Sequence, residues 1–349
     1  MARRFDTLSQ YCSHGFDTVI DVRSPSEFAQ DHLPRAISLP VLSDAERAEV
    51  GTIYVQDSPF RARKVGAALV AQNAARHLQG PLSDLEGGWK PLVYCWRGGQ
   101  RSGSFASILN QVGWRAEVAE GGYRSYRRLV ADTMHDKPLR HRLILLDGNT
   151  GTAKTDLLKI LSSKGMQIVD LEGLAAHRGS IFGAVAKPQP SQKSFEGALA
   201  SAFEGFDPER PVLVEAESSK VGKCQVPRSV WAAMCTAPRI QISAPLAARA
   251  DYLTRAYADI SADPAALKLT IGYLRRLQGA ELVERWQGMV DSNDLRRLAS
   301  ELVKQHYDPR YTKSRNRIDA TVLGEIFANK LTPDALDDVA DRIVALAGV

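Results

Sequence analysis

A short apolar strand, a glycine-containing loop and a helix are predicted in succession across residues 91–111. Segment 91–94 is Pro-Leu-Val-Tyr, the loop 95–102 is Cys-Trp-Arg-Gly-Gly-Gln-Arg-Ser, and a helical pattern continues to residue 111. Similar strand–helix alternation covers the first 135 residues, with strands expected at 17–22, 36–40, 92–94 and 116–119 and a helix at 65–78. Such alternation predicts a parallel sheet covered by helices on both faces.

The loop at 95–102 also has the composition of an anion cradle around a thiol. Gly98 and Gly99 let the chain curl, so that backbone N–H groups point at the sulfur of Cys95. The helix start adds the positive end of its dipole, and Arg101 adds a charge. We therefore predict a lowered thiol pKa and catalytic roles for Cys95 and Arg101; the alternative is a buried core cysteine. The other predicted anion-loop residues are Arg97, Gly98, Gly99, Gln100 and Ser102.

A second α/β unit follows a basic, polar linker near residue 138. The buried strand 143–147 precedes a sequence that fits the phosphate-binding pattern G-x-x-x-x-G-K-[ST], except that Ala153 replaces the second glycine. Backbone N–H groups would hold phosphates, Lys154 would reach the terminal ones, and Thr155 would hold Mg²⁺. A methyl group at Ala153 weakens the expectation of ATP hydrolysis. The predicted phosphate-binding residues are Gly148, Asn149, Thr150, Gly151, Thr152, Lys154 and Thr155.

Polar residues after the next strands are candidates for supporting roles around the phosphate loop. The connection after the strand at 167–170 would lie over the carboxyl end of the sheet, and Glu215 ends the strand at 211–215. Isolated residues of these types are often only surface groups or solvated strand ends. The supporting residues that we predict are His177, Arg178, Ser180, Gln192 and Glu215.

Composition limits the classes of function. The net charge of +5 permits a polyanionic partner without requiring one, and no apolar run has the length of a membrane span. The four cysteines form no zinc or C-x-x-C pattern and no signal peptide is evident, so we expect a cytoplasmic protein. Cations interleaved with aromatic rings suggest nucleic-acid contacts, with a solvated surface as the alternative. The predicted RNA-binding residues are Arg127, Arg128, Arg140, Arg142, Arg310, Tyr311, Lys313, Arg315 and Arg317.

With these motifs in view, the chain resembles the bacterial tRNA 2-selenouridine synthase family. Segments 21–28, 31–34 and 94–102 resemble the rhodanese-like domain of that family. The phosphate loop and segments 177–180, 190–192 and 215–218 resemble its P-loop domain, and 306–309 its helical C-terminal part. The resemblance implies a rhodanese-like parallel-sheet domain at 1–135, a P-loop α/β domain at 136–245 and a helical region at 246–349. Arg35, at a loop position where the family pattern has glycine, is a second departure besides Ala153.

The same resemblance implies a two-step modification of the wobble 2-thiouridine in the anticodon arm of tRNA. Geranyl diphosphate first alkylates the sulfur, and selenophosphate then supplies selenium while the geranylthio group leaves. Cys95 corresponds to the essential cysteine and would carry or position selenium as a selenosulfide-type species, with Arg101 and loop amides on the phosphoryl oxygens. The phosphate loop would hold the diphosphate, with Mg²⁺ at Thr155. The resemblance implies no tightly bound cofactor, no membrane partner, and a selenophosphate-producing enzyme as a further partner.

Three other functions fit parts of the sequence. Cys95-x-x-Gly98-x-x-Arg101-Ser102 also fits a cysteine-dependent phosphatase, although Tyr94 stands where such enzymes usually have histidine. An ATP-dependent tRNA sulfurtransferase would use both loops and would consume ATP. A non-catalytic RNA-binding module would need neither Cys95 nor Lys154.

Overall fold

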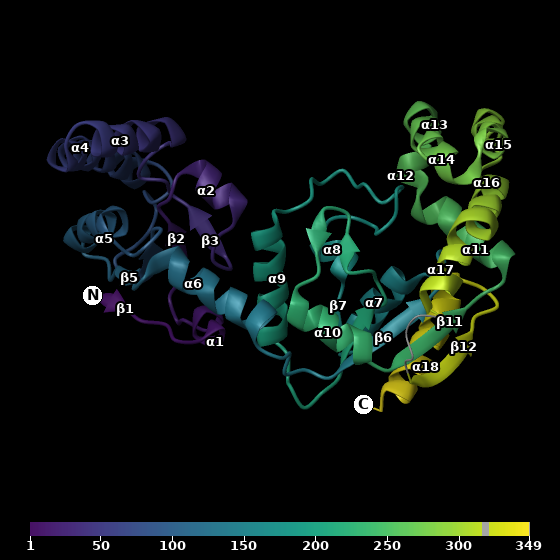
Figure 1. Ribbon diagram of the computed structural model, residues 1–349. Helices are drawn as coiled ribbons and strands as arrows, with labels where there is room; N and C mark the ends of the chain where they lie inside the picture. Colours follow the sequence, from purple (N-terminus) through teal and green to yellow (C-terminus); the bar gives the residue numbers. More distant parts are fainter. Residues whose placement is uncertain (316–320, 349) are drawn as a thin grey trace. The chain divides into compact units, whose positions relative to one another are not determined.

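The computed structural model describes residues 1–315 and 321–348, which form two compact units (Figure 1). Unit 1 consists of Met1–Lys137 together with Pro190–Gly205. Unit 2 consists of Pro138–Gln189 and the chain from Phe206 onward. Within the described residues, no helix combines the length and apolar character that crossing a membrane would require.

Unit 1 is built on a five-stranded parallel sheet with the strand order β1-β5-β4-β2-β3. Its strands are β1 (Ala2–Arg3), β2 (Thr18–Asp21), β3 (Ala36–Ser38), β4 (Pro91–Tyr94) and β5 (Glu117–Ala119). All four residues of the central strand β4 are buried, which explains its purely apolar sequence. The parallel order brings the carboxyl ends of β4, β2 and β5 to one edge, and the loop at Cys95 begins there.

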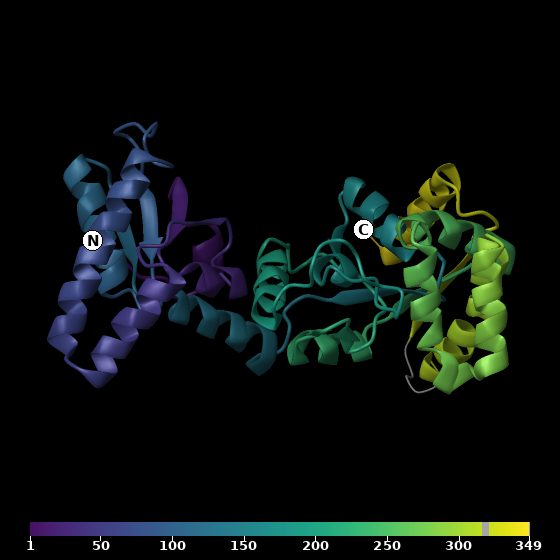
Figure 2. The ribbon, with the colours of Figure 1, turned by 90° about the horizontal axis from the view of Figure 1, so that it is seen from above.

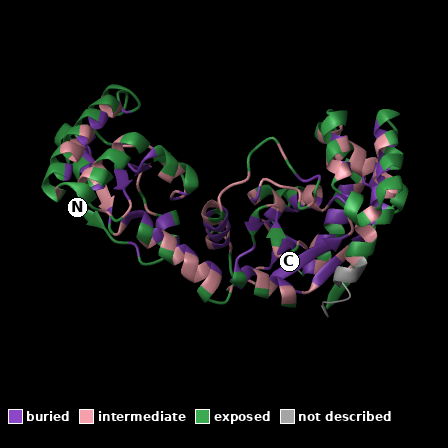
Figure 3. Cartoon of the chain, turned by 45° about the horizontal axis from the view of Figure 1, so that its top comes forward, coloured by how far each residue is buried: buried purple, intermediate pink, exposed green. Residues whose placement is uncertain are grey.

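Several helices surround this sheet. They are α1 (Leu8–Cys12), α2 (Pro25–Gln30), α3 (Asp44–Gln56), α4 (Pro59–Gln79), α5 (Gln100–Val112), α6 (Gly122–Ala131) and a π-helical turn η1 (Asp132–Asp136). Val70 on α4 and Phe105 and Leu109 on α5 share one core cluster with Val93 of β4. Figure 3 shows the central strands of this sheet as mostly buried and the outer helix faces as exposed. The parallel α/β fold predicted for this region is confirmed.

Helix α9 (Gln192–Glu204) belongs to unit 1, although the sequence analysis assigned residues 136–245 to the P-loop domain. It packs against α1, α6 and η1. The carboxylate of Glu196 is buried there and accepts hydrogen bonds from Arg127 and from Gln192 (2.9 Å), with His135 Nε2 at 3.0 Å. The domain boundaries predicted from the sequence did not include this return of the chain to unit 1, because an amphipathic helix does not indicate which of two cores it covers.

Unit 2 contains a second five-stranded parallel sheet, with the order β12-β11-β6-β8-β7. Its strands are β6 (Leu143–Gly148), β7 (Gln167–Val169), β8 (Val212–Glu215), β11 (Arg239–Ser243) and β12 (Val322–Phe327). A small antiparallel pair, β9 (Lys220–Val221) and β10 (Cys224–Gln225), lies outside it. Helices α7 (Lys154–Ser163) and α18 (Pro333–Ala347) pack together over the sheet core.

The remaining helices of unit 2 lie mostly in its C-terminal part. They are α8 (Leu171–Leu174), α10 (Arg228–Thr236), α11 (Leu246–Ala256), α12 (Ala258–Ser261), α13 (Pro264–Gly272), α14 (Arg275–Gln278), α15 (Ala280–Asp291), α16 (Leu295–Leu302), the π-helical turn η2 (Val303–Tyr307) and α17 (Asp308–Arg315). Helices α12 to α16 form a lobe of their own beside the sheet (Figure 2), called the helical lobe below. Trp286, which is fully buried, lies in its core with Ile271 and Val283.

The C-terminal region is helical as predicted, with one exception. A helical region was predicted at 246–349, whereas β12 adds a parallel edge strand to the P-loop sheet beside β11. Only Ile326 of this strand is buried. Its apolar residues Val322, Leu323, Ile326 and Phe327 do not alternate with polar residues, and their spacing also fits a helix, which is why the sequence did not reveal the strand.

Stability should depend on Glu196 in a pH-dependent way. Burial raises the pKa of this carboxyl, but hydrogen bonds from Gln192, Arg127 and His135 outweigh burial and hold the pKa below its usual value. A lowered pKa in the folded state stabilises the protein above about pH 4.3, and this contribution disappears as the pH falls through the folded value. We expect Glu196→Gln to lower the free energy of unfolding by about 1–3 kcal/mol at pH 7.

Urea unfolding of the wild type and Glu196→Gln at pH 7 and pH 4 measures this difference. The gap between the two proteins should narrow at the lower pH. Glu49→Gln, at an exposed position on α3, is the matched control and should change little at either pH. A gap of the same size at both pH values would contradict the assigned role of the ionised carboxylate.

Candidate functional site

Close backbone contacts fix the thiol loop, residues 95–102, between β4 and α5. Gly98 has φ +65°, and a Cβ atom there would lie 2.6 Å from the carbonyl oxygen of Ala119. A Cβ atom on Gly122 would lie 2.2 Å from the carbonyl oxygen of Cys95. That same oxygen accepts a hydrogen bond of 2.9 Å from the N–H of Tyr123. Both positions therefore require glycine, and the β5–α6 turn holds the loop in place.

The sulfur of Cys95 is buried and receives hydrogen bonds from its own loop. The N–H of Gly99 lies 3.3 Å from Sγ, and the hydroxyl of Ser102 lies 3.2 Å from it. Burial alone raises the pKa of the thiol, but hydrogen bonds from Ser102 and from the backbone N–H groups of Gly99 and Arg97 outweigh burial. The pKa of Cys95 therefore lies below its ordinary value, which favours a reactive thiolate.

Arg101 is held by a carboxylate at the edge of the thiol loop. Its Nη1 donates to Glu27 Oε2 over 3.1 Å, and Arg47 Nε lies 3.0 Å from the same oxygen. Burial raises the pKa of Glu27, but these two cations and the Ser24 N–H lower it below its usual range. The guanidinium of Arg101 is thus oriented before any ligand binds. Its predicted contact with a bound anion stays a prediction, as do those of the exposed Arg97 and Gln100.

A buried ion pair lies close to the thiol loop in unit 1. Arg23, which is 1% exposed, lies 2.6 Å from Asp21 and donates to the carbonyl oxygen of Asp31. The rings of Tyr94 and Tyr123 lie 5.6 and 4.0 Å from its guanidinium carbon. Both tyrosines adjoin the loop, because Tyr94 precedes Cys95 and Tyr123 bonds to its carbonyl oxygen. The network therefore makes the strand end that carries Cys95 rigid.

The phosphate loop, residues 148–155, connects β6 to α7 in unit 2. A Cβ atom on Gly148 would lie 2.5 Å from the hydroxyl of Thr152, and Gly151 has φ +86°. Ala153 adopts φ +61° at the start of α7, the left-handed conformation that glycine takes easily. For alanine this conformation costs about 1–2 kcal/mol. The methyl group of Ala153 is buried in the core of unit 2, so it packs beneath the loop.

Lys154 and Thr155 face an acidic side of the phosphate loop. Lys154 Nζ donates to the carbonyl oxygen of Gly148 over 2.7 Å, and Thr155 Oγ1 donates to Glu172 Oε2 over 3.3 Å. Burial lowers the pKa of Lys154, but Tyr311 and three nearby glutamates outweigh it and raise the pKa above its usual value. The ammonium group is therefore charged and available to an anion.

Three glutamates lie close together on this acidic side. Burial and the neighbouring Glu217 raise the pKa of Glu172 to about 8. Burial also raises the pKa values of Glu215 and Glu217. Glu215 ends β8 as predicted, and its carboxylate accepts the N–H of Glu172 over 2.7 Å. No group of three or more His, Cys, Asp or Glu side chains in the described part of the chain is arranged to hold a metal ion.

An ion pair ties the phosphate loop to the C-terminal helices. Arg249 on α11 lies 2.7 Å from Asp308, and its Nε donates to the carbonyl oxygen of Thr150 over 2.9 Å. The amide of Asn149 donates to the same aspartate over 2.9 Å. The phosphate loop is therefore held by α11 and α17 as well as by the sheet strand from which it extends.

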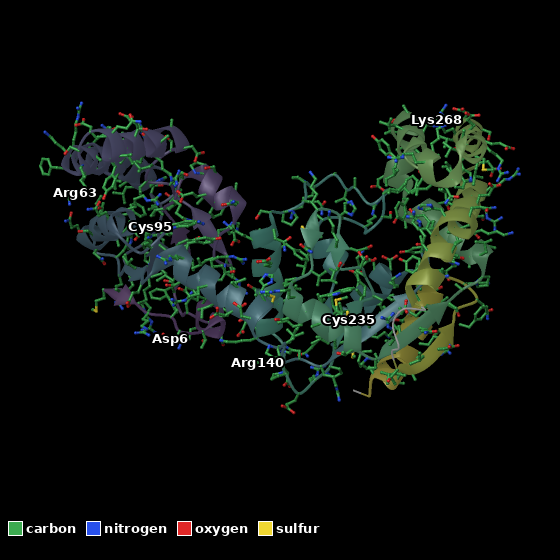
Figure 4. The ribbon with its side chains drawn as sticks, in the orientation of Figure 1. Asp6, Arg63, Cys95, Arg140, Cys235 and Lys268 are labelled. Atoms are coloured by element: carbon green, nitrogen blue, oxygen red, sulfur yellow. The ribbon has the colours of Figure 1, made fainter. Side chains whose placement is uncertain are left out.

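A cavity of about 1130 Å³ adjoins the phosphate loop within unit 2. Predicted residues that line it are Thr150, Gly151, Thr152, Lys154, Thr155, His177, Arg178, Ser180, Arg310 and Tyr311. Arg178 is bound to Asp259 over 2.9 Å. Cys235 on α10 lines the same cavity, whereas Cys95 lies in unit 1 (Figure 4). The predicted supporting residue Gln192 does not line this cavity, because α9 packs on unit 1.

The predicted RNA-binding residues fall into different environments. Arg128, Arg140, Arg142 and Arg310 are exposed. Arg127 is bound by Glu196, which gives it a packing role that the sequence did not indicate. The ring of Tyr311 lies 5.8 Å from Lys154 Nζ. Lys313, Arg315 and Arg317 lie outside the residues whose side chains the structure describes.

Comparison with known proteins agrees with this architecture. The family model described as "Rhodanese-like domain" matches residues 5–129, and the one described as "tRNA 2-selenouridine synthase AAA domain" matches residues 141–270. A tRNA 2-selenouridine synthase from Shewanella denitrificans is 31% identical over 322 residues, which cover 84% of this chain and 87% of that protein. The chain belongs to the tRNA 2-selenouridine synthase family. The resemblance stated from the sequence is thereby confirmed.

Other members of the family match over less of their length. A tRNA 2-selenouridine synthase from Nitrosomonas europaea is 37% identical over 243 residues, which cover 68% of this chain and 63% of that protein. A solved N-terminal domain of a Clostridium difficile 630 protein, titled as ATP/GTP-binding, is 32% identical with a TM-score of 0.32; the match covers 37% of this chain and 98% of that domain. The region shared with the Nitrosomonas relative therefore spans less than two thirds of that relative.

Several residues of the phosphate-loop site were not predicted from the sequence. Glu172, Glu217 and Arg249 were not among the predicted site residues, and neither was Asp308. Glu217 and Asp308 lie within segments that carried the family resemblance, so a signal for them was present. Arg249 lies in an ordinary amphipathic helix, and only the fold brings it to Thr150.

The reactivity of Cys95 should depend on the Ser102 hydroxyl. Removing a hydrogen bond to a thiolate raises the thiol pKa, so Ser102→Ala should move the midpoint of Cys95 alkylation upward by about one pH unit. The measurement is the rate of iodoacetamide modification of the Cys95 peptide between pH 5 and 10, followed by mass spectrometry.

Ser104→Ala is the matched control, because Ser104 is exposed on α5, two residues after Ser102. It should leave the midpoint unchanged. Coincident profiles for the wild type and Ser102→Ala would show that this hydroxyl does not stabilise the thiolate.

Proposed function

We propose that the protein converts the wobble 2-thiouridine of tRNA to 2-selenouridine in two steps, using geranyl diphosphate and then selenophosphate. The observation that carries this proposal is one chain with two distinct anion sites, a thiol loop that lowers the pKa of Cys95 and a phosphate loop that opens on a large cavity. Membership in the tRNA 2-selenouridine synthase family supports the same reaction. Each anion site suits one of the two phosphorus-containing donors.

In the first step, the thiocarbonyl sulfur attacks the first carbon of the geranyl group. The carbon–oxygen bond breaks, diphosphate leaves with the electron pair, and the N3 proton of the uracil ring is released to solvent. Lys154 and the N–H groups of the phosphate loop would bind the diphosphate and stabilise the charge that develops on it. This use of the loop involves no ATP hydrolysis, so the strained Ala153 is compatible with it.

In the second step, selenium of selenophosphate attacks C2 of the uracil ring and the geranylthiolate leaves. The selenium–phosphorus bond must then break to release 2-selenouridine. Attack of the Cys95 thiolate on phosphorus would accept the phosphoryl group without any change of oxidation state, and water would later release phosphate. A selenosulfide on Cys95 would instead require an oxidant. The N–H groups of the thiol loop and Arg101 would bind the phosphoryl oxygens.

The residues beside the phosphate loop also fit a divalent cation. Mg²⁺ prefers oxygen ligands, and the hydroxyl of Thr155 lies 3.3 Å from a carboxylate oxygen of Glu172. When bound, Mg²⁺ would offset the charge of the diphosphate. The acidic surroundings of Lys154 support a bound cation, because a diphosphate alone would bring its negative charge next to three buried carboxyl groups.

The proposed partners are tRNA, bound through its anticodon arm, and an enzyme that supplies selenophosphate. Exposed Arg128, Arg140, Arg142 and Arg310 are the candidates for phosphate contacts. Arg310 also lines the large cavity, which would bring the tRNA backbone near the geranyl donor.

The first experiment is mass spectrometry of nucleosides from 2-thiouridine tRNA incubated with the protein, Mg²⁺ and both donors, with each donor omitted in turn. Geranyl diphosphate alone should yield a geranylated nucleoside, and selenophosphate should convert it to 2-selenouridine. A product that instead depends on ATP and carries no selenium would favour the sulfurtransferase. Phosphate release from aryl phosphates would favour the phosphatase.

Cys95→Ala should abolish selenium incorporation while geranylation and tRNA binding stay within about twofold of the wild type, because a small uncharged side chain adds little affinity. Cys12→Ala, at an exposed position, is the matched control and should behave as the wild type. Normal yields of 2-selenouridine from Cys95→Ala would rule out the assigned role of the thiol.

Lys154→Ala should raise the KM for geranyl diphosphate by about tenfold or more, because a charge-assisted hydrogen bond to the diphosphate is lost. The selenium step, started from tRNA that is already geranylated, should proceed at the normal rate. Lys64→Ala, at an exposed position on α4, is the control for removal of a lysine. An unchanged KM would contradict the assignment of this loop to the geranyl donor.

A further inference from the structure

A second cavity, of about 90 Å³, lies in unit 2 between the phosphate loop and the helical lobe. Helix α16 lines it with Leu295, Leu298, Ala299 and Leu302, which follow the spacing of one helix face. Phe182, from the connection after α8, closes another side and is buried in the core of the lobe. We call this space the apolar cavity.

The apolar cavity adjoins the phosphate site. Thr150 of the phosphate loop, Leu253, Tyr257 and Tyr307 line both the apolar cavity and the large cavity. Thr150 also belongs to the loop that would hold a diphosphate, and Arg249 fixes its carbonyl oxygen. A ligand bound by its phosphates at the loop would therefore have the apolar cavity next to it.

Few polar groups in the apolar cavity are available to a ligand. The hydroxyl of Thr254 donates to the carbonyl oxygen of Asp251 over 2.9 Å. The hydroxyl of Ser261 donates to the carbonyl oxygens of Tyr257 and Ala258. Both hydroxyls are thus used within their own helices, and the hydroxyls of Tyr257 and Tyr307 interact with Ser180. A nucleoside base, which needs hydrogen-bond partners, would lose its contacts with water in this cavity without replacing them.

We propose that the apolar cavity binds the far end of the hydrocarbon chain of an isoprenoid diphosphate and thereby selects donors by chain length. This inference rests on the proposed function, since the phosphate loop must hold the head group. An apolar cavity of about 150 Å³ holds a benzene ring. The apolar cavity beside the phosphate loop is smaller, at about 90 Å³, and suits one five-carbon unit. The first five carbons would lie past Leu253 and Tyr257, and the second five would enter the cavity.

Chain-length selection follows from the burial of the second five-carbon unit. Geranyl diphosphate, with ten carbons, would reach the apolar cavity, and dimethylallyl diphosphate, with five, would not. Ala299→Phe places a ring in the cavity from the face of α16. The variant should weaken binding of geranyl diphosphate by at least about tenfold and change binding of dimethylallyl diphosphate by less than about threefold.

The experiment is calorimetric titration of the full chain, with Mg²⁺ and without tRNA, with three ligands: geranyl, dimethylallyl and inorganic diphosphate. Unchanged affinity for inorganic diphosphate shows that the variant is folded around the phosphate loop. Ser261→Leu, at a second lining position, should reproduce the selective loss if Ala299→Phe fails to fold. Ala265→Phe, at an exposed position on α13, is the matched control and should bind all three ligands as the wild type does.

Each outcome separates the inference from the function on which it rests. Selective loss of geranyl diphosphate binding in Ala299→Phe supports the cavity assignment. Tight geranyl diphosphate binding that neither Ala299→Phe nor Ser261→Leu weakens overturns the inference and leaves the proposed function standing. Failure of the wild type to bind any of the three ligands overturns both.

Discussion

The ion pair between Arg249 and Asp308 is the contact on which the arrangement of unit 2 depends most. Asp308 begins α17, and Arg249 lies near the start of α11, so the pair joins two helices that are far apart in sequence. Both partners also bond to the phosphate loop, through Thr150 and Asn149. Arg249 is 6% exposed, so loss of either partner would leave a largely buried charge without its ion pair. This ion pair therefore fixes the phosphate loop, the C-terminal helices and the boundary between the two cavities relative to one another.

The thiol loop and the phosphate loop reach their curved shapes through different backbone conformations. In the thiol loop, Gly98 and Gly122 allow neighbouring backbone segments to approach closely, and the N–H of Gly99 consequently reaches the sulfur. In the phosphate loop, Ala153 adopts the left-handed conformation that glycine usually supplies. The buried position of its methyl group offsets part of the cost, since burial of apolar surface is favourable. Alanine in place of the usual glycine at position 153 is thus compatible with the loop geometry.

Local features could be predicted from the sequence, whereas long-range packing could not. The strand before Cys95, the phosphate loop before α7 and the parallel sheets follow from apolar runs and glycine positions. The assignment of α9 to unit 1 could not be predicted, because its amphipathic pattern fits either core. Gln192 was consequently expected near the wrong loop. Arg249 carried no local signal at all, since its partners Thr150 and Asp308 are 99 and 59 residues away along the chain.

The charges around Lys154 bear on how the proposed diphosphate and a divalent cation would bind. Glu172, Glu215 and Glu217 all have raised pKa values, chiefly because burial disfavours their charged forms. Protonation of a buried carboxylate reduces the negative charge of such a site. A bare diphosphate would add negative charge beside these groups, and a bare cation would lack its anion. In the proposed function, a diphosphate that binds with a divalent cation would add less net charge than the diphosphate alone, and an attached hydrocarbon chain would be buried in the adjoining cavity.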